Sequence, residues 1–481
     1  MKSNHDLQNV IYHMLVTQIK LGVYHFNDHL PYIKEMSLYL QVAPETIRYA
    51  YNKLKDNHYI SLSKNTGAKI IIEYSQDEIQ NHIQEFFITR KDALIDLSQS
   101  MQPLFSHIQW LSLKNASEES LNELEQLITK REIFVSYRAI HIFLKLFSFL
   151  KNDILIRLIW WIYIFYQIPF FSVYKEISIL EKNGYLLLEI VRLCRQQDWD
   201  KLKIAIDKSH EQIHTNLMQF YKSHIHYASS HEKIAFSWDV YKRNEQKQYS
   251  LGTEIIQDLS RGNYREGSFL PSLDSLAIQK NVSVSTVRRT LTLLRQIGAV
   301  KSINGVGTQI LPINKIAENC DFSQNSTKKR LSDFVQSLYI LTNSCQEIVQ
   351  LTLVHMDESE INQLIILLEK LRNIHRCELA AYSVLHYVVK YAPYNAISII
   401  YSQLFEQLLW GYPLRSIMKV LHNITIHIDT LIECLHIKDF NHCSHIVERL
   451  MINDLISASQ YLEKIGLTTH IDIHTTNLKS K

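Results

Sequence analysis

Two short stretches of this chain carry the same hydrogen-bond donors in the same order. Thr46 and Arg48 recur as Thr286 and Arg288, about 240 positions later. A guanidinium presents a planar fork of N–H donors, which suits bidentate contact with a base edge or a phosphate. Hydroxyls and backbone N–H groups at the start of a helix hold phosphate oxygens. These residue types at this spacing predict recognition of a polyanion.

The repetition extends well beyond these two stretches. The other matched positions, first copy before second, are Leu30 and Leu270, Pro31 and Pro271, Val42 and Val282, Gly22 and Gly262, and Gly67 and Gly307. The copied segment is about 70 residues long in a chain of 481. A repeat of this length and register predicts two copies of one whole module, each about half of the chain.

The second copy indicates most clearly which elements hold these residues. Its spacing of apolar residues predicts three helices and a hairpin, over 249–259, 273–279, 284–296, 300–303 and 308–311. Ser272 suits the N-cap of the second helix, because its hydroxyl can accept a backbone N–H of the first turn. Gly298 suits the end of the third helix. Leu291 and Leu294 are expected to face inward, which leaves the polar residues before them facing outward.

The first copy repeats this order. Its helices are predicted over 7–21, after Leu30-Pro31 and from Pro44, and its hairpin over 60–63 and 68–72. Pro44 suits the first turn of a helix, because its missing N–H has no intrahelical partner there. Three helices and a glycine-tipped hairpin form a small winged helix-turn-helix, whose third helix fits the major groove of DNA. Both copies therefore predict a DNA-reading module, called a reader below.

The candidate DNA contacts lie on the second and third helices and at the hairpin tip of each reader. In the first reader they are Lys34, Glu45, Thr46, Arg48, Tyr49, Lys64 and Gly67. In the second reader they are Ser272, Ser283, Ser285, Thr286, Arg288, Arg289, Gly305 and Gly307. The arginines are expected to reach base edges, whereas hydroxyls and the glycine-bearing tips approach the phosphate backbone.

Both readers carry more basic than acidic residues, as binding to DNA requires. The whole chain has a net charge of only +3, so affinity for DNA must come from local basic faces. Residues 2–73 carry eight Lys or Arg against six Asp or Glu, and residues 243–313 carry nine against five. A winged helix can also dock proteins instead of DNA. That alternative stays open, and it predicts no salt-dependent binding to a duplex.

The second reader resembles that of the GntR family of bacterial transcription regulators. The residues that carry the resemblance are Leu270-Pro271-Ser272, Leu276-Ala277, Val282-Ser283, Thr286-Val287-Arg288, Leu291 and Gly305-Val306-Gly307-Thr308. The first reader keeps Leu30-Pro31, Val42, Thr46-Ile47-Arg48 and Gly67. The resemblance implies sequence-specific binding to an operator. The family's arginine in the second helix is Lys34 in one reader and Asp274 in the other, so its base preference is not carried over.

Each reader is followed by about 165 residues that are predicted to be helical. The parallel positions of these two blocks are Tyr137 and Tyr382, His141 and His386, Asn152 and Asn395, and 186–198 and 426–439. The blocks are similar to the FCD ligand-sensing domain that follows many GntR readers, an all-helical bundle that often coordinates a metal and binds a small carboxylate. Where that domain has an aspartate this chain has tyrosine, and the later histidine of the domain falls at Leu187 and Ile428.

One matched histidine in each block is too few ligands for a metal site, which takes three or four. No cofactor or metal is therefore expected. His141 and His386 are expected either to be satisfied inside the bundle or to line an effector pocket. The aromatic stretch with Trp160, Trp161 and Phe165 is expected to pack in the core rather than to wall such a pocket.

Glycine is scarce outside the two readers. Eight of the 11 glycines lie inside them, and only Gly184, Gly411 and Gly466 lie elsewhere. The chain has no GxGxxG and no GxxxxGK segment, so neither a dinucleotide fold nor a phosphate-gripping loop is expected. A reader fused to an aminotransferase domain would need a glycine-bearing α/β domain with a cofactor lysine. The helical blocks do not supply one, and the chain is not expected to be an enzyme.

The cysteines and one apolar segment indicate in which cellular compartment the chain is expected to lie. The six cysteines form no CxxC pair or finger spacing, which favours reduced thiols in a cytoplasm. Residues 158–174 carry no charge, but the segment is slightly short for a membrane span. A buried core helix is the preferred interpretation, and no membrane partner is expected.

These observations predict a mainly α protein with two winged helix-turn-helix domains, each followed by an all-α bundle. The predicted domains are 1–75, 76–240, 241–313 and 314–481. Regulators of this type pair two readers on half-sites about one helical turn apart. Since one chain holds two readers, we expect a pseudo-dimer that binds a double-stranded DNA operator with an imperfect inverted repeat. The sequence leaves open a small-molecule effector and further pairing of two chains.

Overall fold

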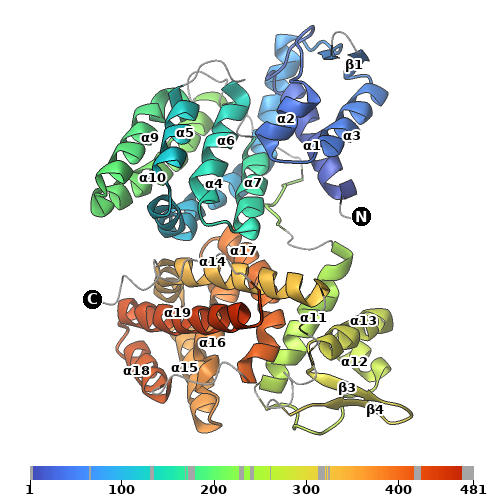
Figure 1. Ribbon diagram of the computed structural model, residues 1–481, viewed down its shortest axis with the longest axis vertical. Helices are drawn as coiled ribbons and strands as arrows, with labels where there is room; N and C mark the ends of the chain where they lie inside the picture. The colour runs from blue at the N-terminus through green and yellow to red at the C-terminus, as the bar shows by residue number, and fades with distance from the viewer. Residues whose placement is uncertain are drawn as a thin grey trace. The chain divides into compact units, whose positions relative to one another are not determined.

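The chain divides into two compact units in the computed structural model (Figure 1). Unit 1 comprises 1–150 and 155–236, and unit 2 comprises 151–154 and 237–481. The structure describes residues 4–63, 67–129, 135–167, 170–171, 179–226, 232–238, 243–260, 262–312, 320, 322, 325–416 and 424–467. Within these ranges each unit contains one antiparallel hairpin and is otherwise mainly helical.

Unit 1 begins with three helices and a hairpin, which we call reader 1. They are α1 (Asn4–Lys20), α2 (Ile33–Leu40), α3 (Pro44–Asp56), β1 (Ile60–Ser63) and β2 (Gly67–Ile70). Pro44 occupies the first turn of α3, as predicted. α3 packs against α1 and α2, and its apolar stripe, which includes Ile47, Ala50 and Leu54, is fully buried. The hairpin pairs Ile60 with Ile70, so its second strand is shorter than the predicted 68–72.

A set of longer helices follows reader 1. They are α4 (Gln76–Lys114), α5 (Glu118–Thr129), α6 (Val135–Ser148), α7 (Asp153–Tyr166), α9 (Ile179–Gln196) and α10 (Trp199–His224). α4 begins at a capping box, in which Ser75 and Glu78 each accept the other's backbone N–H. α4 packs along α10, and the rings of Phe87 and Phe220 lie 4.7 Å apart between them.

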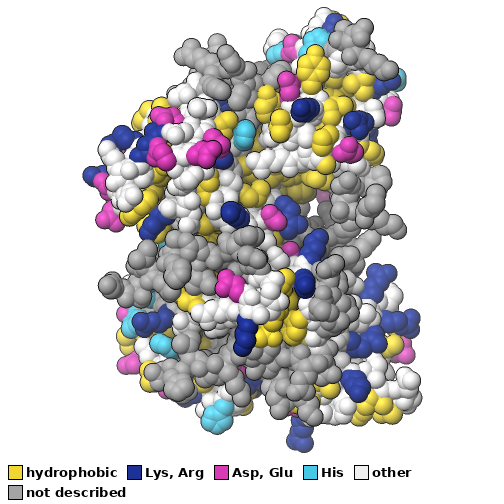
Figure 2. All heavy atoms as spheres, viewed as in Figure 1, with side chains coloured by type: hydrophobic (Ala, Val, Ile, Leu, Met, Phe, Trp, Pro, Cys, Tyr) yellow, Lys and Arg dark blue, Asp and Glu magenta, His cyan; other side chains and the backbone are white. Residues whose placement is uncertain are grey.

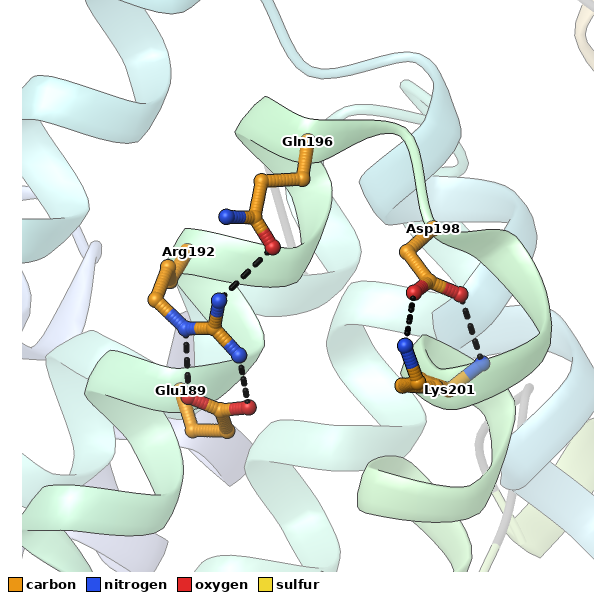
Figure 3. Close-up of polar contacts among 5 residues, drawn as sticks. All are labelled: Glu189, Arg192, Gln196, Asp198 and Lys201. Carbon is orange, nitrogen blue, oxygen red and sulfur yellow. Dashed lines mark hydrogen bonds and ion pairs between the residues drawn. The ribbon is translucent and has the colours of Figure 1, made fainter.

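A tight corner joins α9 to α10 (Figure 3). Asp198 caps α10, because its Oδ1 accepts the N–H of Lys201 at 3.3 Å and its Oδ2 accepts from the Lys201 Nζ at 2.7 Å. On the last turns of α9, the guanidinium of Arg192 donates to both Glu189 and Gln196. Four of its residues, Glu189, Arg192, Gln196 and Asp198, lie within the predicted parallel segment 186–198, and Lys201 follows that segment.

Reader 1 is fixed to the bundle of unit 1 by a buried tyrosine of α6. Tyr137 is fully buried, and its hydroxyl donates to Gln18 Oε1 at 2.6 Å. The hydroxyl of Tyr24 donates to Tyr137 at 3.0 Å, and the ring of Tyr39 stacks on it at 6.0 Å. Burial is the main reason why the pKa of Tyr137 is raised well above its usual value. The seam between reader 1 and α6 is therefore filled by hydrogen-bonded aromatic side chains.

Unit 2 begins with the same kinds of element in the same order, which we call reader 2. They are α11 (Arg243–Ser260), α12 (Leu273–Gln279), α13 (Val284–Gln296), β3 (Val300–Ile303) and β4 (Gly307–Ile310). α12 and α13 have the predicted bounds, and Ser272 caps α12 by accepting the N–H of Ser275 at 3.2 Å. Gly298 follows α13 with a φ of 72°. Leu291 and Leu294 are buried, as predicted.

The rest of unit 2 is helical in its described part. The elements are α14 (Asn325–His355), α15 (Glu358–Asn373), η3 (Cys377–Leu379), α16 (Ala380–Tyr391), α17 (Asn395–Gln407), η4 (Leu408–Ser416), α18 (Ile424–His436) and α19 (Phe440–Lys464). α14 packs along α19. Asp439 caps α19 with backbone angles of −81° and 73°, close to the −83° and 78° of Asp198. The two segments that the sequence pairs thus end in the same local structure.

The apolar segment 158–174 belongs to the core where the structure describes it. Ile159 and Ile162 of α7 are buried, and so are Phe170 and Phe171. Trp160 is buried as well, and Phe165 packs edge-on against Phe236 at 5.2 Å. The prediction of a core segment is confirmed for the buried residues among these, whereas Trp161 and Phe165 are half-buried. None of the described helices has the length and apolarity that crossing a membrane requires.

Candidate nucleic-acid interface

The N-terminal end of α13 presents a cluster of hydroxyls. Ser283 caps the helix, because its Oγ accepts the N–H of Thr286 at 3.2 Å. The same Oγ lies 2.9 Å from the hydroxyl of Ser285 and 2.8 Å from that of Thr286. Ser283 and Ser285 are exposed, and Thr286 is half-buried. Hydroxyls and N–H groups at the positive end of a helix dipole form a binding site for phosphate.

Two arginines follow on the exposed side of the same helix. Arg288 and Arg289 are both exposed, and neither guanidinium has a hydrogen-bond or ion-pair partner among the described residues. Lys301 of the neighbouring strand β3 is also exposed. Figure 2 shows Lys and Arg side chains gathered where Figure 1 places α12, α13 and the hairpin. As far as the described residues go, these three cations have no acidic partner and can pair with an incoming polyanion.

A hollow of about 530 Å³ lies between α11 and the start of α13. Its lining consists of Lys247, Ser250, Leu251, Glu254, Lys280, Asn281, Val282, Ser283 and Thr286. Lys280 is held by Glu254 at 2.7 Å and by Asp258 at 3.0 Å, whereas Lys247 is exposed. Lys247 and Asn281 were missed by the sequence reasoning, because they lie outside the second and third helices. The only signal for Asn281 was its place in the turn between those helices.

The N-terminal end of α3 is built differently. Ala43 stands at its N-cap and offers no side-chain hydrogen bond. Arg48 is exposed, and its guanidinium lies 3.5 Å from the carboxylate of Glu45. Tyr49 is half-buried. Reader 1 therefore presents an arginine at the predicted place, but with an acidic neighbour and without the hydroxyl cluster of α13.

Thr46 does not belong to this surface. It is fully buried, and its Oγ1 has no hydrogen-bond partner in the described chain. The physical reason is helical spacing, since Thr46 lies one turn before Ala50 and two turns before Leu54, on the stripe that faces the core. The prediction that Thr46 contacts DNA is wrong for this conformation, because no duplex can reach its side chain.

The remaining candidate residues lie at exposed turns and helix starts. Lys34 and Ser272 are exposed on the first turn and at the N-cap of the second helix of their readers. The hairpin glycines Gly67, Gly305 and Gly307 have φ values of 70°, 74° and 143°, which L side chains adopt only with strain. Lys64 lies outside the described residues. The part that these residues play in binding stays a prediction.

The two histidines of the bundles lie in different surroundings. His141 of α6 is half-buried, and its pKa is lowered by burial and by the nearby Lys145. His386 of α16 lines a cavity, and its ring lies 6.2 Å from that of Phe405. The described ranges hold no group of three His, Cys, Asp or Glu side chains that could bind a metal. All six cysteines are buried thiols.

Comparison with known families and proteins bears on reader 2. Residues 248–310 match the model of the family described as "Bacterial regulatory proteins, gntR family". The "Uncharacterized HTH-type transcriptional regulator YydK" of Bacillus subtilis is 32% identical over 88 residues, which cover 18% of this chain and 37% of YydK. YhcF of the same organism, with the same description, is 27% identical over 100 residues, which cover 21% of this chain and 81% of YhcF. Both relatives are described as transcriptional regulators.

Solved structures give weaker matches. Streptococcus agalactiae GntR is 16% identical with a TM-score of 0.21, and the match covers 44% of this chain and 99% of that chain. E. coli McbR/YncC is 19% identical with a TM-score of 0.24, and the match covers 46% of this chain and 100% of that chain. The part of the chain that is similar to the gntR family of bacterial regulatory proteins is residues 248–310, within reader 2.

Proposed function

We propose that this chain is a sequence-specific, DNA-binding transcription regulator with two winged-helix readers. The observation that carries the proposal is the exposed start of α13, inside the segment that matches the gntR family. It has a hydroxyl cluster and two arginines without a partner among the described residues. Ser283 and Ser285 would hold phosphates there, and Arg288 would reach a base edge. Lys247 and Lys301 would add backbone contacts on either side.

Reader 1 supports an extension of the proposal to both halves of the chain. Its helices and strands follow the same order as those of reader 2. Each reader is also followed by a series of helices. We take this as support for a tandem duplication with domains 1–75, 76–240, 241–313 and 314–481, in which the second and fourth are FCD-like bundles. The chain would then act in the cytoplasm as an intrachain pseudo-dimer. Because the readers differ at their helix starts, the preferred operator would be an imperfect inverted repeat.

The test is selection of bound duplexes from a random DNA pool by the purified full chain. We expect an enriched motif with two unlike halves. We also expect the logarithm of the association constant to fall linearly with the logarithm of the salt concentration. Lys64→Ala is expected to lower affinity evenly across sequences and to reduce the salt slope by about one. A mass measurement of the complex distinguishes one chain per duplex from two.

The alternative is a regulatory scaffold whose winged helices dock proteins. It predicts no enrichment of any duplex, and no salt-dependent affinity for random DNA. Either reader alone can be tested in the full chain, since Arg48→Ala and Arg288→Ala address one reader each. Enrichment of a motif that is lost in both variants would exclude the scaffold as the sole function.

A further inference from the structure

The third helices of the two readers, α3 and α13, bury the same positions. Both helices have 13 residues. The buried positions that recur, first helix before second, are Ile47 and Val287, Ala50 and Thr290, Tyr51 and Leu291, and Leu54 and Leu294. A helix that buries the same stripe exposes the same opposite face. Residues with the same place in α3 and α13 can therefore be compared directly.

The second residue of the two helices differs in chemistry. It is Glu45 in α3 and Ser285 in α13, and both are exposed. The fifth residue is an exposed arginine in both helices, Arg48 and Arg288. A serine hydroxyl can donate or accept a hydrogen bond, whereas an ionised carboxylate only accepts. The two readers thus offer different hydrogen-bonding groups at one matched place beside the same arginine.

The carboxylate of Glu45 depends on Arg48. Its side chain is 66% exposed and lies 3.5 Å from the guanidinium of Arg48, which is its one partner within the described residues. When Arg48 turns to a guanine, the carboxylate loses this partner. A carboxylate that leaves water without gaining a donor costs free energy. On a bound duplex, Glu45 therefore needs a donor from the DNA.

Major-groove chemistry limits the donors that DNA can offer. Guanine presents two acceptors there, and thymine presents one acceptor and a methyl group. Adenine presents an amino donor beside an acceptor, whereas cytosine presents an amino donor alone. The second oxygen of a carboxylate would face the acceptor of adenine, so cytosine is the base that suits a carboxylate best.

The spacing of the two charged groups fits neighbouring base pairs. Consecutive bases on one strand lie about 3.4 Å apart. The charged groups of Glu45 and Arg48 are 3.5 Å apart. Arginine to guanine is the commonest specific contact in the major groove. Side chains at this separation can address a guanine and the base pair beside it.

We infer that Glu45 makes reader 1 select cytosine at the base pair next to the guanine that Arg48 reads. Ser285 gives reader 2 no such selection, because a hydroxyl pairs with donors and acceptors alike. The inference rests on the proposed function, since it names the DNA sequence that the same surface takes. The carboxylate lowers the affinity for every duplex by repelling phosphates, and lowers it least where cytosine satisfies it.

A purely structural role for Glu45 makes a different prediction. A carboxylate in the first turn stabilises a helix through the helix dipole, and its pair with Arg48 three residues later adds a little. With that role alone, replacing Glu45 lowers the stability of α3 and leaves the base preference unchanged. Base preference is therefore the measurement that separates the two roles.

The test is selection of bound duplexes from a random DNA pool by the full chain and by reciprocal variants. The parent chain is expected to enrich a motif in which one half has a preferred cytosine and the other half has no preferred base at the matching position. Glu45→Ser is expected to lose the preference in the first half, and Ser285→Glu is expected to create one in the second half. Both substitutions together are expected to move the preference from one half to the other.

Anisotropy titrations with four duplexes that differ only at this base pair measure the size of the effect. Replacing the cytosine is expected to weaken binding of the parent chain roughly five- to tenfold, and binding of Glu45→Ser much less. Glu45→Ser is also expected to bind all four duplexes more tightly than the parent chain does, with the smallest gain for cytosine. Asp56→Ser is the matched control, because it removes the same charge from the exposed last residue of α3. It is expected to keep the preference.

The outcomes separate the inference from the proposed function. A cytosine preference that persists in Glu45→Ser, or that is lost equally in Asp56→Ser, would overturn the inference. A second half-site that stays indifferent in Ser285→Glu would do the same. An enriched motif without a preferred cytosine would also overturn the inference, and would leave the proposed function standing. A pool in which neither the parent chain nor any variant enriches a duplex would instead overturn the proposed function.

Discussion

The guanidinium of Arg48 lies 3.5 Å from the carboxylate of Glu45, three residues earlier on the same exposed face of α3. At the matching place of α13, Ser285 stands where Glu45 stands, and Arg288 has no acidic partner in the chain as described. An exposed pair of this kind contributes little to stability. It does lower the electrostatic attraction of reader 1 for phosphate, and Arg48 must leave Glu45 to reach a base. The two readers are therefore expected to contribute unequally to DNA affinity.

Alanine substitution of the two arginines tests this inequality. We expect Arg288→Ala to weaken binding to the selected duplex by about 1–3 kcal/mol, because a bidentate contact to a base is lost. Arg48→Ala is expected to cost less, since Glu45 already competes for the guanidinium. Fluorescence anisotropy titrations at fixed salt measure both. Glu45→Gln is expected to strengthen binding by reader 1, because it removes the competing charge.

A control for these titrations lies far along the chain, on α9. Arg192 is engaged by Glu189 and Gln196 (Figure 3), and lies outside both readers. Arg192→Ala removes the same charge from the chain and is expected to leave DNA affinity unchanged. A loss equal to that of Arg288→Ala would assign the effect to net charge rather than to a contact. Neutral behaviour of Arg288→Ala would remove that residue from the DNA interface.

The N-caps of α3 and α13, the third helices of the two readers, give a second prediction. Ser283 accepts the N–H of Thr286 at 3.2 Å, whereas Ala43 offers α3 no such bond. Ser283→Ala is expected to destabilise α13 by about 1 kcal/mol, which corresponds to about fivefold faster hydrogen exchange of its first-turn amides. Ala43→Ser is expected to slow exchange in α3 in return. Unchanged exchange in both helices would contradict a role for the cap.

The sequence predicts local elements well where capping residues and spacing agree. α12 and α13 have their predicted bounds because Ser272 and Ser283 start them and the apolar period continues up to Gly298. Thr46 was misplaced because its match to Thr286 outweighed its position on the stripe of Ala50 and Leu54, although that stripe is visible in the sequence.

Other features could not be predicted from local patterns. The contact of Tyr137 with Gln18 joins residues 119 positions apart, and the cavity beside His386 needs six separate elements to meet. The spacing of apolar residues does not predict contacts between distant elements, because these contacts depend on how whole helices pack. The hollow beside α13 has the same origin, since Lys247 of α11 joins the start of α13 only after folding.

Stability is expected to fall in mild acid because of one buried histidine. His210 of α10 is 4% exposed and its Nε2 lies 3.1 Å from Gln109 Oε1. Burial lowers its pKa from 6.5 to about 4. The unfolded chain takes up a proton near pH 6.5 and the folded chain does not, so stability is present above pH 6.5 and is lost as the pH falls toward 4. The loss amounts to at most about 3 kcal/mol.

Denaturant unfolding between pH 7.5 and 4.5 measures this loss. His210→Gln keeps a hydrogen-bonding group beside Gln109 but does not titrate, so the variant is expected to show a shallower decline with acid than the parent chain. The comparison isolates His210, because every other histidine is common to both proteins. Identical pH profiles for the two proteins would mean that His210 takes up its proton in the folded state as readily as in the unfolded one.

The two glycines that lie in helical elements outside the readers are expected to respond in opposite ways to an added methyl group. At Gly411 in η4 a Cβ would lie 2.2 Å from the buried ring of Phe334 on α14, whereas at Gly184 in α9 it would meet no atom within 4 Å. Gly411→Ala is therefore expected to destabilise unit 2 by about 1–3 kcal/mol or more, because a packed ring must move. Gly184→Ala is expected to stabilise α9 by about 0.5–1 kcal/mol. Hydrogen exchange of α14 and α9 separates the two effects, and a Gly411→Ala variant as protected as its parent would contradict the packing of η4 on α14.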